Sequence, residues 1–574
     1  MDQGLQSKKY TAWQLLCAYW HSEHRGFAYG LLAVVISMTM VLVGMDVVFN
    51  YWYNYFYNAL QAYDKHGAVS LLIVFMFLAT VFIVISVYRY YVTQFFGLRW
   101  RQWMTNQFIN RWLEKRSYYY LENFDVNTDN PDQRIQEDAG AIVTISLDLL
   151  VGLVGSITTF IAFIYILWTL SGVIKLPLGS WGTLTIPGYL VWVAIIYSCI
   201  GTFLAFKIGR PLVALNFEQQ RREATFRFSA IDLRTHSEHV ALYRGEADEN
   251  RILHKLFGRV LENWYMIILR QKLLLWFTSG YSQMSVFLPL LVVLPNYFNK
   301  VFLLGGLMQS LRAFASIQDA LSFLVSSYTS IAQWRAVVKR LLTFLNHMAE
   351  IEDQAILQNK LIYKKFPSNK IVVRNLSLNT PRGEPLLRDI NEQFDFGGHY
   401  LLKGASGIGK STFIRAIAGI WPFGEGDIEL PEKESVIYLP QKPYVPLGSL
   451  REALLFPHDL TVSPSDEVVS QALEDCHLHN LIQRLYEAAR WSELLSPGEL
   501  QRISFARILL HKPDWIFLDE STSSLDLANE KYLYKLLKEK LPRSAVISVG
   551  HQASTEAFHD AIIDLEKYSA HPSS

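Results

Sequence analysis

Cysteine and charge are both scarce in this chain of 574 residues. Its three cysteines, Cys17, Cys199 and Cys476, lie far apart, which excludes a disulfide framework and a cysteine-based metal site. Charged residues make up 18% of the chain, below the roughly 25% of an average globular protein. The formal net charge is only +1, without the positive excess typical of proteins that bind nucleic acid, so no nucleic-acid partner is expected.

Hydrophobic residues, by contrast, make up 51% of the chain, and they are unevenly distributed. Long apolar runs fill the first part, up to residue 336, whereas short strands, glycine turns and helices alternate after residue 360. A helix that crosses a bilayer needs about 20 mostly apolar residues, and six runs come near that length or exceed it. We therefore expect membrane spans at 28–50, 69–90, 147–171, 188–207, 272–295 and 302–330.

Positive charge indicates how these spans are oriented. The two long connections, 91–146 and 208–271, are rich in arginine and lysine, and the other connections contain few of either. Positive charge gathers on the cytoplasmic side, so both long connections and both termini are expected in the cytoplasm. Their helical pattern predicts that they continue the membrane helices beyond the bilayer. The expected organisation is an N-terminal segment 1–27, a six-helix membrane domain 28–336, a linker 337–368 and a soluble α/β domain 369–574.

The predicted α/β domain contains a phosphate-binding loop near its beginning. The segment LLKGASGIGKSTFIRAIAG fits the P-loop pattern G-x-x-x-x-G-K-[ST] between an apolar strand and an apolar helix. Its glycines let backbone N–H groups approach the α- and β-phosphates, Lys410 reaches the β- and γ-phosphate oxygens, and Ser411 ligates Mg²⁺. The predicted nucleotide contacts are Gly404, Ala405, Ser406, Gly407, Ile408, Gly409, Lys410, Ser411 and Thr412.

Two carboxylates end a later apolar strand, DWIFLDE at 514–520. After a P-loop, this arrangement favours Asp519 as a Mg²⁺ ligand and Glu520 as the group that polarises the attacking water. His551 ends another apolar strand, AVISVGH, and is expected to contact the γ-phosphate.

A further helix start lies at LSPGELQR, residues 495–502. Ser496 and Glu499 form an S-x-x-E capping box, with Pro497 at the first helical position. An ordinary helix start explains this pattern. An anion-binding helix N-terminus also explains it, because unpaired N–H groups and the helix dipole favour a phosphate there.

Taken in order, these motifs resemble those of an ABC-transporter ATPase: the P-loop, a Q-loop at Gln441, the signature LSPGELQR, FLDE, the D-loop SSLD at 523–526, and the switch histidine His551. Six spans followed by one such domain resemble an exporter-type ABC half-transporter. The resemblance implies ATP-driven transport, with Gln441 at the nucleotide and Mg²⁺. It also implies that Ser496, Gly498 and Glu499 face the γ-phosphate bound to a second subunit, in a homodimer or a heterodimer.

Other segments are similar to the D-subfamily of these transporters: DNPDQRIQED (129–138), EHVALYRGE (238–246), GGLMQSLRAF (305–314) and the proline in the signature. That subfamily comprises peroxisomal and lysosomal half-transporters and bacterial relatives for cobalamin or peptide uptake, with a membrane domain akin to the SbmA/BacA group. The resemblance implies a bacterial inner membrane, with an organellar membrane as the alternative. Two departures are Pro497, where glycine is usual, and Asn379–Pro381, where an adenine-stacking aromatic is usual.

The sixth span carries polar residues at helical spacing. Gln309, Arg312, Ser316 and Asp319 share one face, and ionisable groups at this depth are costly against lipid. The face therefore lines a cargo cavity, or Arg312 and Asp319 form a structural partnership. A polar cavity favours an amphipathic or hydrophilic solute, cobalamin-like or a peptide. Alternatives are a fatty acyl-CoA or lipid cargo and an ATP-gated channel.

Two cytoplasmic segments are expected to transmit force between the ATPase and the membrane domain. The family resemblance places contacts to the ATPase at the first, Asn130, Pro131, Asp132, Gln133 and Arg134, and at the second, 238–246. A solvated polar loop is the alternative for both.

Overall fold

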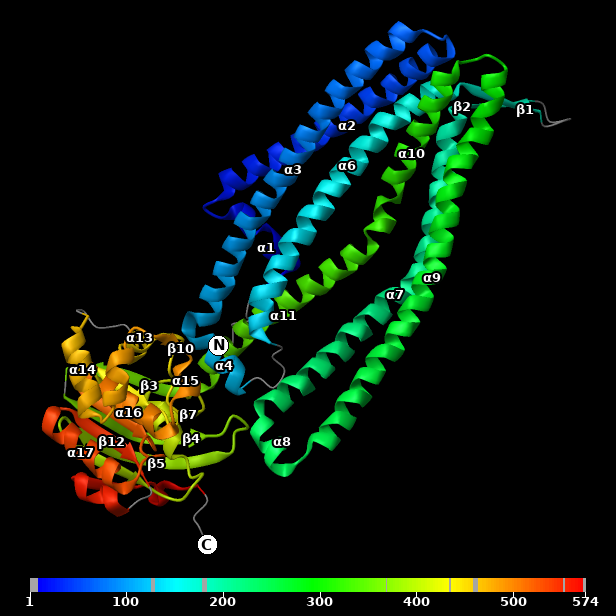
Figure 1. The fold of residues 1–574 in the computed structure, drawn as a ribbon. Coiled ribbons are helices and arrows are strands. Elements are labelled where there is room, and N and C mark those ends of the chain that lie inside the picture. The colour runs from blue at the N-terminus through cyan, green and yellow to red at the C-terminus, as the bar shows by residue number, and fades with distance from the viewer. Residues whose placement is uncertain are drawn as a thin grey trace, which may run out of the picture. The chain divides into compact units, whose positions relative to one another are not determined.

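The computed structural model describes residues 9–124, 130–177, 183–367, 369–432, 435–457, 463–550 and 553–570. The chain divides into two compact units, Met1–Ala349 and Glu350–Ser574 (Figure 1). This boundary falls inside the predicted linker 337–368, and one helix, α11 (Tyr328–Gln358), includes it.

Long helices make up the first unit (Figure 1). The principal ones are α2 (Arg25–Gln61), α3 (Lys65–Leu113), α6 (Ala139–Ser171), α7 (Tyr189–Thr235), α9 (Glu246–Phe298) and α10 (Leu304–Ser326). Shorter elements are α1 (Ala12–Cys17), α4 (Ser117–Phe124), α5 (Pro131–Gln133), the π-helical turn η3 (Arg134–Asp138), α8 (Ser237–Tyr243) and the antiparallel strands β1 (Val173–Pro177) and β2 (Thr183–Pro187).

Within the described residues, five helical segments are long and apolar enough to cross a membrane. They contain α2, α3, α6, α7 and α9, which hold the first five predicted spans. The prediction that α3, α7 and α9 continue as helices well beyond their spans is confirmed, since α9 alone has 53 residues.

The sixth predicted span, 302–330, differs from the other five. The corresponding helix, α10, does not reach their length and apolarity in the part of the chain that the structure describes. It packs against α2, α6, α7 and α9 instead of facing only lipid, and its Ala313, Phe314 and Ile317 are fully buried. The sixth span, predicted at roughly 302–330, corresponds to α10, but its predicted end is too late, because α10 ends at Ser326 and α11 begins at Tyr328. Backbone hydrogen bonds continue through Ser327, so the break is a change of helix direction (Figure 1).

The start of α10 is capped by side chains of α2. The first backbone N–H groups of a helix lack partners within that helix. The amide oxygen of Gln61 accepts the N–H of Leu304 at 2.7 Å, and that of Asn58 accepts the N–H of Gly305 at 2.9 Å. Gly305 allows this close approach, since a Cβ there would lie 2.0 Å from the backbone oxygen of Asn54.

The second unit contains two large sheets and a two-stranded sheet of β9 and β10. One large sheet has the order β3-β7-β4-β5 and the other the order β13-β6-β12-β11-β8. The first comprises β3 (Asn359–Phe366), β4 (Lys370–Asn379), β5 (Pro385–Asp395) and β7 (Gly424–Pro431). The second comprises β6 (His399–Lys403), β8 (Val436–Leu439), β11 (Trp515–Asp519), β12 (Ala545–Val549) and β13 (Ala561–Asp564). The remaining α-helices and strands are α12 (Lys410–Ile417), β9 (Gly448–Ser449), α13 (Leu450–Leu454), α14 (Asp466–Asp475), β10 (Ala488–Ala489), α15 (Trp491–Leu494), α16 (Pro497–His511) and α17 (Leu527–Lys540).

All neighbouring strands of the five-stranded sheet are parallel. The apolar strands β11 and β12 are buried almost throughout, as expected for a parallel sheet covered on both faces. Because the strands are parallel, their carboxyl ends meet at one edge, which is the usual place for a ligand in such sheets. This edge receives the loops that follow β6, β8 and β11.

The close approach of α10 to α2 predicts that Gly305→Ala destabilises the protein. The added methyl meets a backbone oxygen that cannot move aside, so we expect a loss of about 1–3 kcal/mol. The matched control is Gly280→Ala in α9, where a Cβ meets nothing within 4 Å. Thermal unfolding of both purified variants provides the test, and equal midpoints would contradict this account of the α2–α10 contact.

Candidate functional site

The P-loop has the backbone conformation that its glycines predict. Gly404, Gly407 and Gly409 have φ values of +144°, +83° and +114°, which residues with a side chain rarely adopt. At Gly409 a Cβ would also lie 3.2 Å from a methyl carbon of Leu387 in β5. Ala405, Ser406 and Ile408 complete the loop, and Thr412 follows in the first turn of α12.

Lys410 lies at the base of this loop with 5% of its surface exposed. Its Nζ donates to the carbonyl oxygens of Gly404 at 2.8 Å and Ala405 at 3.0 Å. Burial lowers the pKa of Lys410, and the nearby carboxylates of Glu520 and Asp519 oppose that shift. The ammonium group is therefore held beside the loop that is predicted to enclose the phosphates.

Ser411 and Asp519 meet across the edge of the sheet. The Ser411 hydroxyl donates to Oδ1 of Asp519 at 2.8 Å. Burial raises the pKa of the Asp519 carboxyl, and the hydrogen bond from Ser411 opposes that shift. Hydroxyl and carboxylate oxygens are the ligands that Mg²⁺ prefers. A cation bound there would also offset the cost of burying the negative charge of Asp519. The two residues therefore fit a Mg²⁺ site.

Gln441 and Glu520 form the next pair along the same edge. Leu439 of β8 is paired with Leu518 of β11, so the residues two positions further on also lie close together. The Gln441 side-chain amide donates to Oε2 of Glu520 at 2.8 Å. His551, the predicted γ-phosphate contact, lies outside the described residues.

Glu566 is a neighbour of the P-loop that the sequence motifs do not indicate. Its Oε1 accepts the backbone N–H of Ala405 at 3.0 Å, across 161 positions of sequence. The cause is strand pairing, since Asp564 at the end of β13 lies opposite Lys403 at the end of β6. No local pattern marks Glu566, and only the placement of β13 beside β6 could have identified it.

The capping box at the start of α16 is confirmed. Ser496 is the N-cap, its hydroxyl accepts the N–H of Glu499, and Pro497 occupies the first turn. Oε2 of Glu499 accepts from the Ser496 backbone N–H at 3.0 Å and from its hydroxyl at 2.8 Å. The Ser496 hydroxyl is thus engaged within its own helix start.

Gln501 connects this helix to the SSLD segment by a hydrogen bond. It belongs to LSPGELQR, but the sequence predicted no role for it. Its side chain is 1% exposed, and its Oε1 accepts the backbone N–H of Ser524 at 3.0 Å. A Cβ at Gly498 would lie 3.3 Å from the Ser524 carbonyl oxygen, so glycine permits this approach. Across the described ranges, no hydrogen bond joins 496–499 to the loop 404–411 of the same chain.

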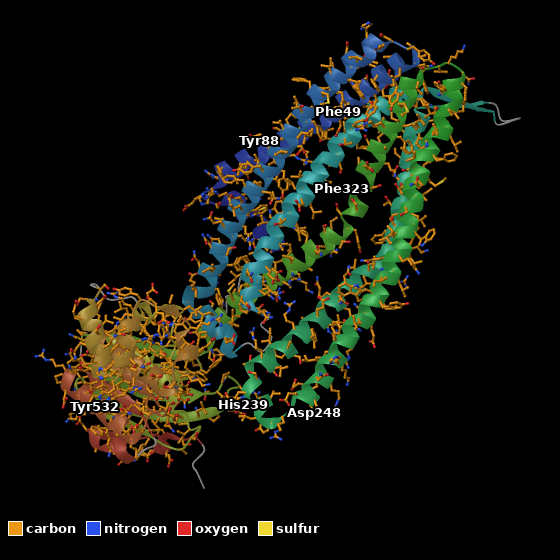
Figure 2. All side chains as sticks on the ribbon, in the orientation of Figure 1. Phe49, Tyr88, His239, Asp248, Phe323 and Tyr532 are labelled. Atoms are coloured by element: carbon orange, nitrogen blue, oxygen red, sulfur yellow. The ribbon has the colours of Figure 1, made fainter. Side chains whose placement is uncertain are left out.

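The membrane unit contains a cavity of about 550 Å³ between α2, α3, α6 and α10. Its lining includes Asp46, Arg89, Asp148, Ser316, Asp319 and Phe323. Phe323, labelled in Figure 2, packs toward α6, where a Cβ at Gly152 would lie 2.4 Å from its ring. Three carboxylates and one guanidinium thus face a shared space.

The four predicted cavity residues divide into two sets, because only Ser316 and Asp319 line this cavity. Gln309 is 2% exposed and accepts from the side-chain amide of Asn54 in α2 at 2.5 Å. The guanidinium of Arg312 lies 4.7 Å from the ring centre of Tyr53. In the described structure no ion pair joins Arg312 to Asp319, so the structural partnership is not formed here.

The predicted force-transmitting segment forms a short helix and the beginning of a π-turn. Asn130 and Asp132 are exposed, and Pro131 and Gln133 are half-buried. Arg134 is 5% exposed and donates to Asp138 at 2.5 Å. Four of the five residues are therefore accessible, and Arg134 anchors them. The second segment, 238–246, contains most of α8.

Comparisons with known proteins agree with this geometry. Residues 15–298 match the ABC transporter transmembrane region 2 family, and residues 387–523 match the ABC transporter family. The inner membrane ABC transporter ATP-binding protein YddA of Escherichia coli (strain K12) is 33% identical over 96% of this chain and 96% of the relative. The chain belongs to the ABC transporter family.

As an ABC half-transporter, the protein carries a membrane-spanning unit and an ATPase domain that hydrolyses ATP to drive transport. ABC transporter D family member 2, chloroplastic, of Arabidopsis thaliana is 30% identical over 95% of this chain and 84% of the relative, so the D-subfamily resemblance is confirmed. The structure of a bacterial Atm1-family ABC exporter with ATP bound has a TM-score of 0.71 at 17% identity, over 94% of this chain and 93% of that one. This likeness confirms the exporter-type fold.

The contact of Glu566 with the P-loop predicts that it tunes the affinity for ATP. Glu566→Gln keeps an oxygen that accepts the Ala405 N–H but removes a negative charge, so we expect ATP binding about fivefold tighter. Glu566→Ala also removes the acceptor and should bind ATP more weakly than Glu566→Gln. The control is Glu474→Gln, an exposed change of equal charge on α14. Titration of the full chain with a fluorescent ATP analogue measures these affinities, and identical values for Glu566→Gln and the control would refute the role.

Proposed function

We propose that two copies of this half-transporter assemble head-to-tail, with each ATP enclosed between the P-loop of one copy and the signature helix of the other. The observation that carries the proposal is that 404–411 and 496–499 share no hydrogen bond within the described part of one chain. A two-fold axis would create two equivalent shared sites. The capping box leaves the helix start well ordered, and its bonds do not use the N–H of Gly498. The Ser496 hydroxyl and the Glu499 N–H, which bond to each other in the single chain, would turn toward the γ-phosphate bound to the second copy. A heterodimer with a related chain is the alternative assembly.

Each residue of the ATP site has a proposed task. The loop amides hold the α- and β-phosphates, and Lys410 reaches the β- and γ-phosphate oxygens. Ser411, Asp519 and Gln441 would hold Mg²⁺. When bound, Mg²⁺ supplies charge neutralisation on the phosphate oxygens. The carboxylate of Glu520 orients and polarises the attacking water. The side-chain amide of Gln441 holds this carboxylate in place by donating to its Oε2 at 2.8 Å. His551 contacts the γ-phosphate in this proposal.

The proposed cargo is an amphipathic or hydrophilic solute, cobalamin-like or a peptide. Ser316 and Asp319 lie with Asp46, Arg89 and Asp148 around the membrane cavity, and charged groups at that depth favour polar contents over a lipid tail. A fatty acyl-CoA remains the alternative cargo, since the charged Arg89 could hold its phosphates. The accessible residues of 130–134 are proposed to couple cargo movement to the ATPase.

The protein is an integral membrane protein, and we propose the bacterial inner membrane with both termini in the cytoplasm. The name of the Escherichia coli relative supports the location, and the arginine and lysine content of 91–146 and 208–271 supports the orientation.

The cargo proposal is tested with full-length protein in liposomes. We expect cobalamin or a peptide to raise ATP hydrolysis above the rate without solute, and Asp319→Asn to reduce this stimulation about tenfold, as loss of one charged contact can do. Glu262→Gln, an exposed change of equal charge on α9, is the control. Stimulation by a fatty acyl-CoA alone, or equal stimulation of Asp319→Asn and the control, would contradict the proposal.

A further inference from the structure

Two arginines from different elements converge on one buried carboxylate in the membrane unit. Asp138, 3% exposed, ends the π-turn η3. Its Oδ2 accepts from Nη1 of Arg134 at 2.5 Å and from Nε of Arg340 at 2.9 Å. Its Oδ1 accepts from Nη2 of Arg340 at 2.6 Å. Arg340 therefore grips the carboxylate with two parallel hydrogen bonds, the strongest and most directional arrangement for this pair.

Neighbouring contacts hold the same region in place. Nη2 of Arg101 in α3 donates to the carbonyl oxygen of Gln136 at 3.2 Å. Gly140 leaves room for this arginine, since a Cβ at position 140 would lie 2.9 Å from Nε of Arg101. One to two turns further along α6, Nε1 of Trp334 in α11 donates to Ser146 at 2.8 Å. The π-turn is thereby fixed against both α3 and α11.

Burial of Asp138 and Arg134, with Arg340 only partly buried beside them, is an expensive way to join two helices. A well-packed apolar cluster can be as stable as a buried ion pair, so the pair is better explained by the geometry that it imposes. The geometry is specific here, because Arg134 belongs to the segment 130–134 and Arg340 to α11. Single π-turns are frequent at functional sites, where the extra residue redirects a side chain. In this protein the π-turn ends at the shared carboxylate.

Helix α11 is the helix that leads toward the ATPase unit. Arg340 lies ten residues before Glu350, where the second unit begins, which is about 15 Å along a continuous helix. A rotation or shift of α11 would therefore act on Asp138 through two hydrogen bonds, and on the segment 130–134 through Arg134.

We propose that Asp138 and Arg340 act as positioning residues that fix the segment 130–134 to α11, so that ATP-driven movement of α11 carries the segment with it. This Asp138–Arg340 link rests on the proposed transport function. It requires that the segment and α11 move as one body, and it assigns no contact with ATP or cargo to either residue.

The test measures movement of the segment directly. In full-length protein whose cysteines have been replaced, spin labels are placed at Asp132 and at Leu242 of α8, both exposed, with an excess of unlabelled chains. The distance between labels is compared with and without saturating ATP and Mg²⁺ in liposomes. ATP affinity and thermal unfolding are recorded for each variant.

We expect Asp138→Asn and Arg340→Ala each to lose more than roughly half of the ATP-induced change in distance, with ATP affinity unchanged. Arg340→Lys keeps the charge but not the two-pronged contact, so an intermediate change is expected. The control is Lys339→Ala, the exposed neighbour on α11, which should behave as the wild type.

A wild-type change in distance in both Asp138→Asn and Arg340→Ala would overturn the link. If those two variants do not fold, Arg340→Lys decides, and a full wild-type change in that variant overturns it. Failure of the proposed function has a different signature, because the wild type itself would then hydrolyse ATP without moving the labels.

Discussion

Parallel pairing of β6, β8, β11, β12 and β13 is the constraint on which the ATP site depends. It brings the P-loop, Gln441, Asp519 and Glu520 to one edge of a buried sheet, although they are spread over more than a hundred positions of sequence. The hydrogen bonds Ser411–Asp519 and Gln441–Glu520 are direct consequences of this pairing. The same pairing places Glu566 against Ala405, near the start of the P-loop.

In the membrane unit the constraint comes from the bilayer. The unit's long helices can expose apolar side chains to lipid, so polar groups concentrate where helices face one another. Helix α10 illustrates this rule, because α2 caps its start and binds Gln309, and its Asp319 faces a cavity shared with three other helices. The pair Asp138–Arg340 lies in the same unit and involves α11. There the buried carboxylate fixes the position of a chain segment and does not line a cavity.

Local patterns predicted local features well. The first five apolar runs, the P-loop conformation and the Ser496–Glu499 capping box each depend on residues within one helix or one loop, and their spacing carries the information. Contacts between distant elements were not predictable in this way. Periodicity placed Gln309 and Asp319 on one face of α10, but it could not show that α2 takes the first and a cavity takes the second. Asp138 and Arg340, separated by 202 positions, have no pattern that connects them. The break at Ser327 was missed because backbone hydrogen bonding continues through it and no proline or glycine lies between 321 and 335 to mark it.

Photolabelling in a mixed dimer determines whether each ATP is shared between two chains. A heavy-isotope chain carrying Lys410→Ala, which cannot hold nucleotide at its own P-loop, is mixed with a light chain carrying Glu520→Gln. ATP with a photoreactive group on the γ-phosphate is then activated, and labelled peptides are identified by mass. If the site is shared, the label lies on the heavy chain's peptide containing 495–502. Label confined to the light chain, on its own P-loop and its own 495–502 peptide, would contradict a shared site.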